Sequence, residues 1–163
     1  MSRYRTFWRR LFAGVADSLI FYPLLVVDGW VWSAEPSPVA LLAWSAIAFF
    51  ALTFYSVLMH SQDGQTLGKM IFGVKVLDVS ESRLPTLRQA AMRDVGIIAL
   101  NVGGYLYLVY VVLAQDPSSL PDQLLSWAEF AWFMLEVVTM LWNIQRRAFH
   151  DLLANTVVVR VIR

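Results

Sequence analysis

Four acidic residues stand inside long apolar stretches of this chain: Asp17, Asp28, Glu129 and Glu136. An ionised carboxylate surrounded by hydrocarbon is destabilised by several kcal/mol unless it is paired, hydrated or protonated. Carboxyl groups that gain and lose a proton or a cation at such depth are typical of transport paths. We therefore treat these acids as the candidate ion or proton path.

Depth along the helices groups the four acids into two pairs. At about 1.5 Å per residue, Asp17 lies about 9 Å inside the inner edge of its apolar stretch, and Glu136 lies at a similar depth. The same count puts Asp28 and Glu129 near the outer edge. Asp17 and Asp28 are eleven residues apart and Glu129 and Glu136 are seven apart, so each of these pairs lies on one stripe of its own helix. If the two stripes face each other, the acids stand at two levels of one path.

Between Asp17 and Asp28, Pro23 removes a backbone hydrogen bond to the carbonyl of Leu19, which leaves an acceptor for water or a cation. The alternative is that Asp28 and Glu129 are interfacial, Glu136 is protonated by burial, and Pro23 is an ordinary kink.

A basic residue stands at the entrance of the first apolar stretch. Arg10, Ala13 and Asp17 are spaced i, i+3 and i+7, which puts them on one face of a helix. Arg10 is a poor direct partner for Asp17, because the two lie about 10 Å apart along the helix axis. Three basic residues elsewhere in the chain could supply the missing charge: Lys69, Arg147 and His150.

The elements that carry these residues are apolar and long enough to cross a membrane. Of the 163 residues, 58% are hydrophobic and only 15% are charged, a composition outside the soluble range. A helix of about 20 residues crosses the roughly 30 Å hydrocarbon core of a bilayer. The stretches that meet this length are about 11–32, 39–59, 95–114 and 124–142. The sequence therefore predicts an all-α integral membrane protein with four transmembrane helices.

The basic residues orient this membrane protein. Every lysine and arginine lies at the N-terminus, in the middle loop or in the C-terminal tail, whereas the loops 33–38 and 115–123 contain none. Basic loops stay on the cytoplasmic side of a membrane. We therefore expect a multi-pass protein of the plasma (inner) membrane with both termini and the middle loop in the cytoplasm.

Two segments outside the apolar stretches favour extended structure. Residues 74–79 partly alternate apolar and polar side chains, and residues 156–162 are strongly β-forming. A lone strand would leave its backbone unpaired, so we expect these segments to pair as a small two-stranded β ribbon. Between them, residues 87–94 are expected to form a short cytoplasmic amphipathic helix that leads into the third span.

Three ordered motifs run from the beginning to the end of the chain: Arg10-x-x-Ala13-x-x-x-Asp17, Gly64-x-Thr66-x-Gly68-Lys69-x-x-x-Gly73 and Arg147-x-x-His150-Asp151. Together they resemble the pattern of the RDD family of small bacterial membrane proteins. The resemblance implies a single RDD-type transmembrane domain over residues 1–163, and it maps the family's one arginine and two aspartates onto Arg10, Asp17 and Asp151. It implies these supporting residues: Ala13, Gly64, Thr66, Gly68, Lys69, Gly73, Arg147 and His150. One departure is Asn155, where the family more often has glycine.

Transport is the function that the resemblance and the embedded acids favour together, either as ion or proton exchange or as movement of an unidentified ligand. Four spans are few to enclose a path, so this hypothesis also predicts a homo-oligomer. The alternative is a non-catalytic membrane scaffold or interaction protein. In that case Arg10, Asp17, Arg147 and Asp151 form a structural ion-pair cluster that fastens the ribbon and tail to the helices.

Other site classes are not expected. His150 has no nucleophile at a recognisable elbow beside it, so we do not expect an enzyme. Residues 64–69 depart from a Walker loop in the spacing of their glycines and in the residue after the lysine, and no cofactor is expected. His60 and His150 lack neighbouring ligands for a metal. The expected partners are the lipid bilayer, another copy of the chain, and a cytoplasmic protein or anionic lipid, but not nucleic acid.

Overall fold

The computed structural model describes residues 2–114 and 120–161, and this part of the chain is mostly helical. Its elements in chain order are the 3-10 helix η1 (Ser2–Tyr4), α1 (Phe7–Ile20), α2 (Tyr22–Ser33), α3 (Pro38–Gln62), α4 (Leu67–Ile71), β1 (Val74–Asp78), α5 (Leu87–Arg93), α6 (Val95–Ala114), α7 (Leu120–Trp142), α8 (Phe149–Leu153) and β2 (Thr156–Arg160). Residues 115–119 of the predicted outer loop and residue 162 of the predicted ribbon lie outside the described residues.

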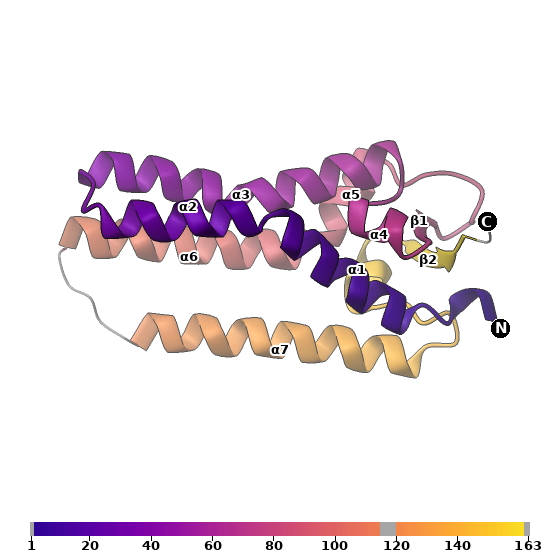
Figure 1. Cartoon of the computed structure of the whole chain (residues 1–163). Coiled ribbons are helices and arrows are strands. Elements are labelled where there is room, and N and C mark those ends of the chain that lie inside the picture. The colour runs from indigo at the N-terminus through magenta and orange to yellow at the C-terminus, as the bar shows by residue number, and fades with distance from the viewer. Residues whose placement is uncertain (1, 115–119, 162–163) are drawn as a thin grey trace.

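The long helices α2, α3, α6 and α7 run along the length of the molecule (Figure 1). Helix α1 continues from α2 toward the end where the two strands, α4, α8 and both chain termini gather. We call this the sheet end. The turn between α2 and α3 lies at the opposite end. The short elements thus form a cap on one end of a helical bundle.

Three helices are long and apolar enough to cross a membrane: α3, α6 and residues Gln123–Trp142 of α7. The pair α1 and α2 makes a fourth span if the two are counted together, and they meet at an angle of 47°. Pro23 stands in the first turn of α2, where its missing N–H costs no helical hydrogen bond. The predicted first helix is therefore bent into two, while the predicted class of helical membrane protein is confirmed.

The tightly packed core lies at the sheet end. Val74, Val76 and Val158 form a cluster in which no residue is more than 1% exposed. Along the long helices, by contrast, large apolar side chains such as Leu19 and Trp30 are 67% and 69% exposed. Apolar surface of this extent is stable against lipid and costly in water. The burial pattern is therefore that of helices made to face a bilayer.

The predicted ribbon is confirmed. Strands β1 and β2 pair antiparallel, from Val74 opposite Arg160 to Asp78 opposite Thr156. Next to the sheet, the carbonyl of Gly64 accepts a hydrogen bond from the amide of Val76 at 2.7 Å. Gly64 has a φ of +69°, and a β-carbon there would lie 2.6 Å from the Val76 carbonyl oxygen, so only glycine fits.

The predicted amphipathic helix is α5, which follows an N-terminal capping box. The Thr86 hydroxyl accepts a hydrogen bond from the Gln89 amide, and the Gln89 side chain accepts one from the Thr86 amide. Helix α5 ends at Arg93, and α6 begins two residues later. This connection places Arg93 at the junction between the cap and the membrane helices.

Candidate functional site

Asp17 is held at the N-terminus of α4. It lies on α1 and is only 7% exposed. Its carboxylate accepts hydrogen bonds from the Gly68 amide (2.8 Å), the Thr66 hydroxyl (2.6 Å) and the Tyr55 hydroxyl (2.9 Å). A helix N-terminus offers free N–H donors and partial positive charge, so it stabilises a carboxylate. The partner of Asp17 is therefore a helix end and two hydroxyls rather than a basic side chain.

The glycine motif explains how α4 reaches Asp17. Thr66 is the N-cap of α4, and its hydroxyl accepts a hydrogen bond from the Lys69 amide in the first turn of that short helix. A β-carbon at Gly68 would lie 2.1 Å from the carbonyl oxygen of Ala13, so the close approach of α4 to α1 requires glycine. Ala13 itself is fully buried. Gly73 acts through its backbone, because its carbonyl accepts the amide of Val161 at 2.9 Å.

Asp151 lies between two arginines and is fully buried. Arg10 donates to one carboxylate oxygen at 2.7 Å, and Arg93 donates to the other through a short hydrogen bond. The backbone amide of Ala148 also donates to Asp151, at 3.0 Å. Burial disfavours the charged carboxylate, but the charges of Arg10 and Arg93 outweigh it and hold the pKa of Asp151 well below its usual range.

His150 connects this ion cluster to the membrane helix α7. Its Nε2 lies 3.2 Å from the guanidinium of Arg10 and 3.1 Å from that of Arg93. Guanidinium nitrogens only donate, so Nε2 must accept and the ring proton is assigned to Nδ1. Nδ1 then donates to the Glu136 carboxylate at 2.6 Å. We call Arg10, Arg93, His150, Asp151 and Glu136 the sheet-end network.

Lys69 and Arg147 lie beside this network without an ion pair in the described structure. Burial lowers the pKa of Lys69 to about 8, helped by the charge of Arg93 and opposed by the carboxylate of Asp17. Arg147 donates to two backbone carbonyls, those of Thr156 at 2.9 Å and Asp151 at 3.0 Å. Its guanidinium therefore fastens β2 to α8 instead of completing a cluster with Asp17.

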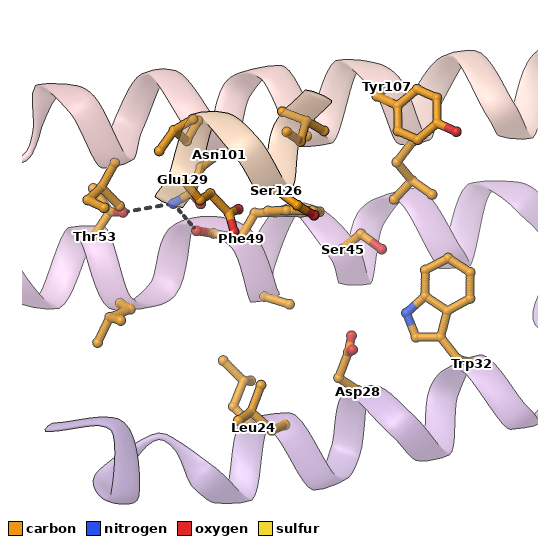
Figure 2. A pocket seen from close by; sticks show the side chains of 18 of the residues that line it. Leu24, Asp28, Trp32, Ser45, Phe49, Thr53, Asn101, Tyr107, Ser126 and Glu129 are labelled. Atoms are coloured by element: carbon orange, nitrogen blue, oxygen red, sulfur yellow. Dashed lines mark hydrogen bonds between the residues drawn. The ribbon is translucent and has the colours of Figure 1, made fainter. Parts of the chain in front are cut away.

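A cavity of about 820 Å³ is lined by residues of α2, α3, α6 and α7 (Figure 2). Its walls are mostly aliphatic and aromatic, as at Leu24, Phe49 and Leu108. Two carboxylates line it as well, Asp28 from α2 and Glu129 from α7. Figure 2 shows Asp28 pointing from α2 toward α3, whereas Glu129 comes from α7 and lines the cavity together with Asn101 of α6. We call this the intramembrane cavity.

Polar groups of α3 and α6 complete the intramembrane cavity. The indole of Trp44 donates to the Asp28 carboxylate at 2.9 Å. The side-chain nitrogen of Asn101 donates to the Phe49 carbonyl at 2.7 Å and to the Thr53 hydroxyl at 3.1 Å, which leaves its amide oxygen as an acceptor. Ser45 lines the same cavity and is 2% exposed. The cavity therefore brings acids and hydrogen-bonding groups together between mostly apolar walls.

The structure places the four acids differently from the two pairs that were predicted from their depth along the helices. Asp28 and Glu129 line one cavity, whereas Asp17 is capped by α4 and Glu136 bonds to His150. Sequence analysis overlooked four further residues that build these places: Tyr55, Arg93, Ser45 and Asn101. Of these, only Arg93 had a clear signal, since it shares the buried face of α5 with Ala90 just before an apolar span.

The chain is similar to known proteins over most of its length. A family model described as "RDD family" matches residues 4–155. The protein named "Uncharacterized membrane protein YteJ" from Bacillus subtilis (strain 168) is 31% identical over 124 residues, which cover 71% of this chain and 72% of that protein. No solved structure shows a significant match.

Proposed function

This chain belongs to the RDD family, and on that premise we propose that it is a transport protein of the plasma (inner) membrane that exchanges protons for a cation at the carboxylates of the intramembrane cavity. The observation that carries the proposal is the position of Asp28 and Glu129 on different helices at one cavity. A charge placed there is costly, so each carboxylate gains by binding either a proton or a cation. Competition between the two is the chemistry that an exchanger needs.

Helix α7 links the intramembrane cavity to the sheet end. Glu129 and Glu136 lie seven residues apart, which is about two helical turns and the same side of the helix. Glu136 is bonded to His150, whose other ring nitrogen meets two arginines. In this proposal Glu136 is the carboxylate that takes up and releases the proton at the sheet end of α7, and His150 holds it in place through the Nδ1 hydrogen bond.

The proposed orientation puts the sheet end in the cytoplasm. Four basic residues gather in that cap: Arg10, Lys69, Arg93 and Arg147. Positive charge of this kind stays on the cytoplasmic side during membrane insertion. We also propose that the cap contacts anionic lipid or a cytoplasmic protein. Because one chain has few spans to enclose a path, we further propose a homo-oligomer. We propose no enzymatic role.

A structural role for the family-signature residues has its own support. Asp17 accepts three hydrogen bonds, and Asp151 is enclosed by two arginines and a backbone amide, so both carboxylates already have several partners within the protein. A scaffold whose Arg/Asp cluster only fastens the cap to the helices is therefore the second candidate function. It predicts a folded protein without flux.

Proton exchange is tested in proteoliposomes that enclose a pH-sensitive dye. A gradient of Na⁺, K⁺, choline or tetraphenylphosphonium is imposed, and the internal pH is followed. We expect at least one of these cations to drive proton movement by the wild-type protein. Asp28→Asn and Glu129→Gln should reduce that movement to the level of liposomes without protein. Glu35→Gln is the matched control, because Glu35 lies in the turn after α2 and does not line the intramembrane cavity.

Two outcomes would contradict the proposal. One is the absence of proton movement with every cation from wild-type protein that is folded by circular dichroism and gel filtration, which would favour the scaffold. The other is undiminished movement in the Asp28→Asn, Glu129→Gln double variant.

A further inference from the structure

We propose that the cation taken up by the intramembrane cavity is an amphipathic organic cation, a molecule with one positive charge and an apolar body. This inference rests on the proposed function and names the substrate class of the same site. It follows from four properties of the cavity: its charge, an unpaired hydroxyl, its apolar walls and the lack of a metal-ligand set.

The charge of the intramembrane cavity calls for a positive ligand. Asp28 and Glu129 line it, and none of the described residues that line it is lysine, arginine or histidine. Within residues 2–114 and 120–161, the Asp28 carboxylate accepts its hydrogen bond from the neutral indole of Trp44. A carboxylate in hydrocarbon without a counter-charge is unstable. A cationic group entering the cavity would supply a counter-charge.

The hydroxyl of Ser45 favours a ligand with a polar group in the cavity. Its hydroxyl oxygen is buried and has no hydrogen-bond partner in the described part of the chain, although the residue lines the cavity. Serine and threonine within helices normally bond to a carbonyl one turn earlier. Ser18 and Thr139 of this chain do so, to Gly14 at 3.0 Å and Leu135 at 2.8 Å. The Ser45 hydroxyl instead stays available to a ligand that fills the cavity.

The walls and size of the cavity suit an apolar body. A volume of about 820 Å³ falls within the range of sites for small organic molecules. Leu24 and Leu108 offer aliphatic surface, and Trp32, Phe49 and Tyr107 offer aromatic rings. An organic cation is attracted to aromatic faces as well as to carboxylates. A bare metal ion would leave most of this surface without a contact.

The donor set does not suit a metal ion. Hard cations such as Ca²⁺ and Mg²⁺ take about six or more oxygen ligands in a compact shell. Within residues 2–114 and 120–161, no group of three histidine, aspartate or glutamate side chains is arranged to hold a metal. Two carboxylates on separate walls fit a single delocalised or shielded charge better than a coordinated ion.

The test compares tetraphenylphosphonium with tetraphenylborate, which have nearly the same size and shape and opposite charge. Binding to the detergent-solubilised protein is measured by isothermal titration calorimetry, with protein-free micelles as the blank. We expect saturable binding of tetraphenylphosphonium and at least tenfold weaker binding of tetraphenylborate. Na⁺ at the same concentrations should not compete.

Variants assign the binding to the intramembrane cavity. The Asp28→Asn, Glu129→Gln double variant should weaken tetraphenylphosphonium binding at least tenfold. Ala48→Phe fills the cavity without changing its charge and should weaken binding as well. The matched control is Ala43→Phe, which adds the same ring to an exposed position of α3 that does not line the cavity. Circular dichroism and gel filtration show whether each variant is folded.

The outcomes separate this inference from the proposed function. No saturable tetraphenylphosphonium binding by folded wild-type protein overturns the inference, and so does equal binding of the two ions. Binding that survives in both the double variant and Ala48→Phe also overturns it, because the ion then binds elsewhere. If Na⁺ or K⁺ drives proton movement in a protein that does not bind tetraphenylphosphonium, the proposed exchange is supported and the proposed organic-cation ligand is wrong. If tetraphenylphosphonium binds at the cavity but no cation moves protons, the ligand class stands and exchange falls.

Discussion

Arg93 of α5 and Asp151 of α8 form an ion pair across 58 positions of sequence, with only 4% of the arginine side chain and none of the aspartate side chain exposed. The pair joins the helix that leads into α6 to the short helix that leads into β2. Arg10 of α1 binds the other oxygen of the same carboxylate. One buried acid therefore ties three separate parts of the chain together at the sheet end.

Replacing Asp151 should be strongly destabilising. Asp151→Asn leaves two buried guanidinium groups without their counter-charge, a loss of about 3–5 kcal/mol for a buried pair. The apparent melting temperature in detergent should fall by more than about 6 °C. Glu81→Gln is the control, since Glu81 pairs with the half-exposed Arg3 and such pairs contribute little. Equal melting temperatures for the two variants would show that the Arg93–Asp151 pair is not structural.

A single methyl group should separate α4 from α1. In Gly68→Ala the new β-carbon would meet the Ala13 carbonyl oxygen at 2.1 Å, so α4 must move and Asp17 loses its amide donor. We expect a clear loss of thermal stability. Gly14→Ala on α1 is the matched control because its β-carbon meets nothing within 4 Å, and alanine favours a helix. The contact between the helices would be unimportant if both variants melt alike.

Two chemically identical substitutions on the first span should have opposite consequences. In Asp17→Asn one carboxylate oxygen becomes an NH2 donor that faces either the Thr66 hydroxyl or the Tyr55 hydroxyl and the Gly68 amide, so the substitution should lower the melting temperature. Asp28→Asn keeps an oxygen for the Trp44 indole and removes a charge from the membrane, so the melting temperature should hold or rise while flux is lost. A stable Asp17→Asn protein would contradict the capping role.

Lys69 should make stability depend on pH in the alkaline range. Its pKa is about 8 in the folded protein against an ordinary value of 10.5, so between these values the unfolded chain binds more protons. Stability must then rise with pH through this window and stay flat just below it. The melting temperature measured at pH 7 and pH 9.5 should therefore increase in the wild type more than in Lys69→Met. Parallel pH profiles in the two proteins would rule out this effect of Lys69.

Much of the fold follows from local patterns in the sequence. Apolar length predicts the spans, and β-forming runs at residues 74–79 and 156–162 predict the ribbon that β1 and β2 form. The bend of 47° between α1 and α2 is harder to predict from the sequence than the spans are, because Pro23 permits a break without specifying its angle. Within a continuous helix, proline removes one hydrogen bond and crowds the carbonyl four residues earlier, which can produce either a kink or a complete break.

The candidate site was less predictable, because it depends on contacts between distant segments. The motif residues Thr66 and Gly68 signalled a special loop, but no local pattern says that its helix end would cap Asp17. Depth in the membrane paired Asp17 with Glu136, whereas the rotation of each helix decides which acid faces a cavity. Ser45 and Asn101 carry no charge within an apolar span, so only their three-dimensional position distinguishes them.

Cation-driven proton movement by Glu129→Gln in proteoliposomes tests the role of the intramembrane cavity most directly. Glu129 lines the cavity and lies outside the sheet-end network, so its replacement leaves the cap intact. We predict a folded protein whose internal pH trace matches that of liposomes without protein, beside an active wild type. A Glu129→Gln protein that moves protons at the wild-type rate would contradict transport through this cavity.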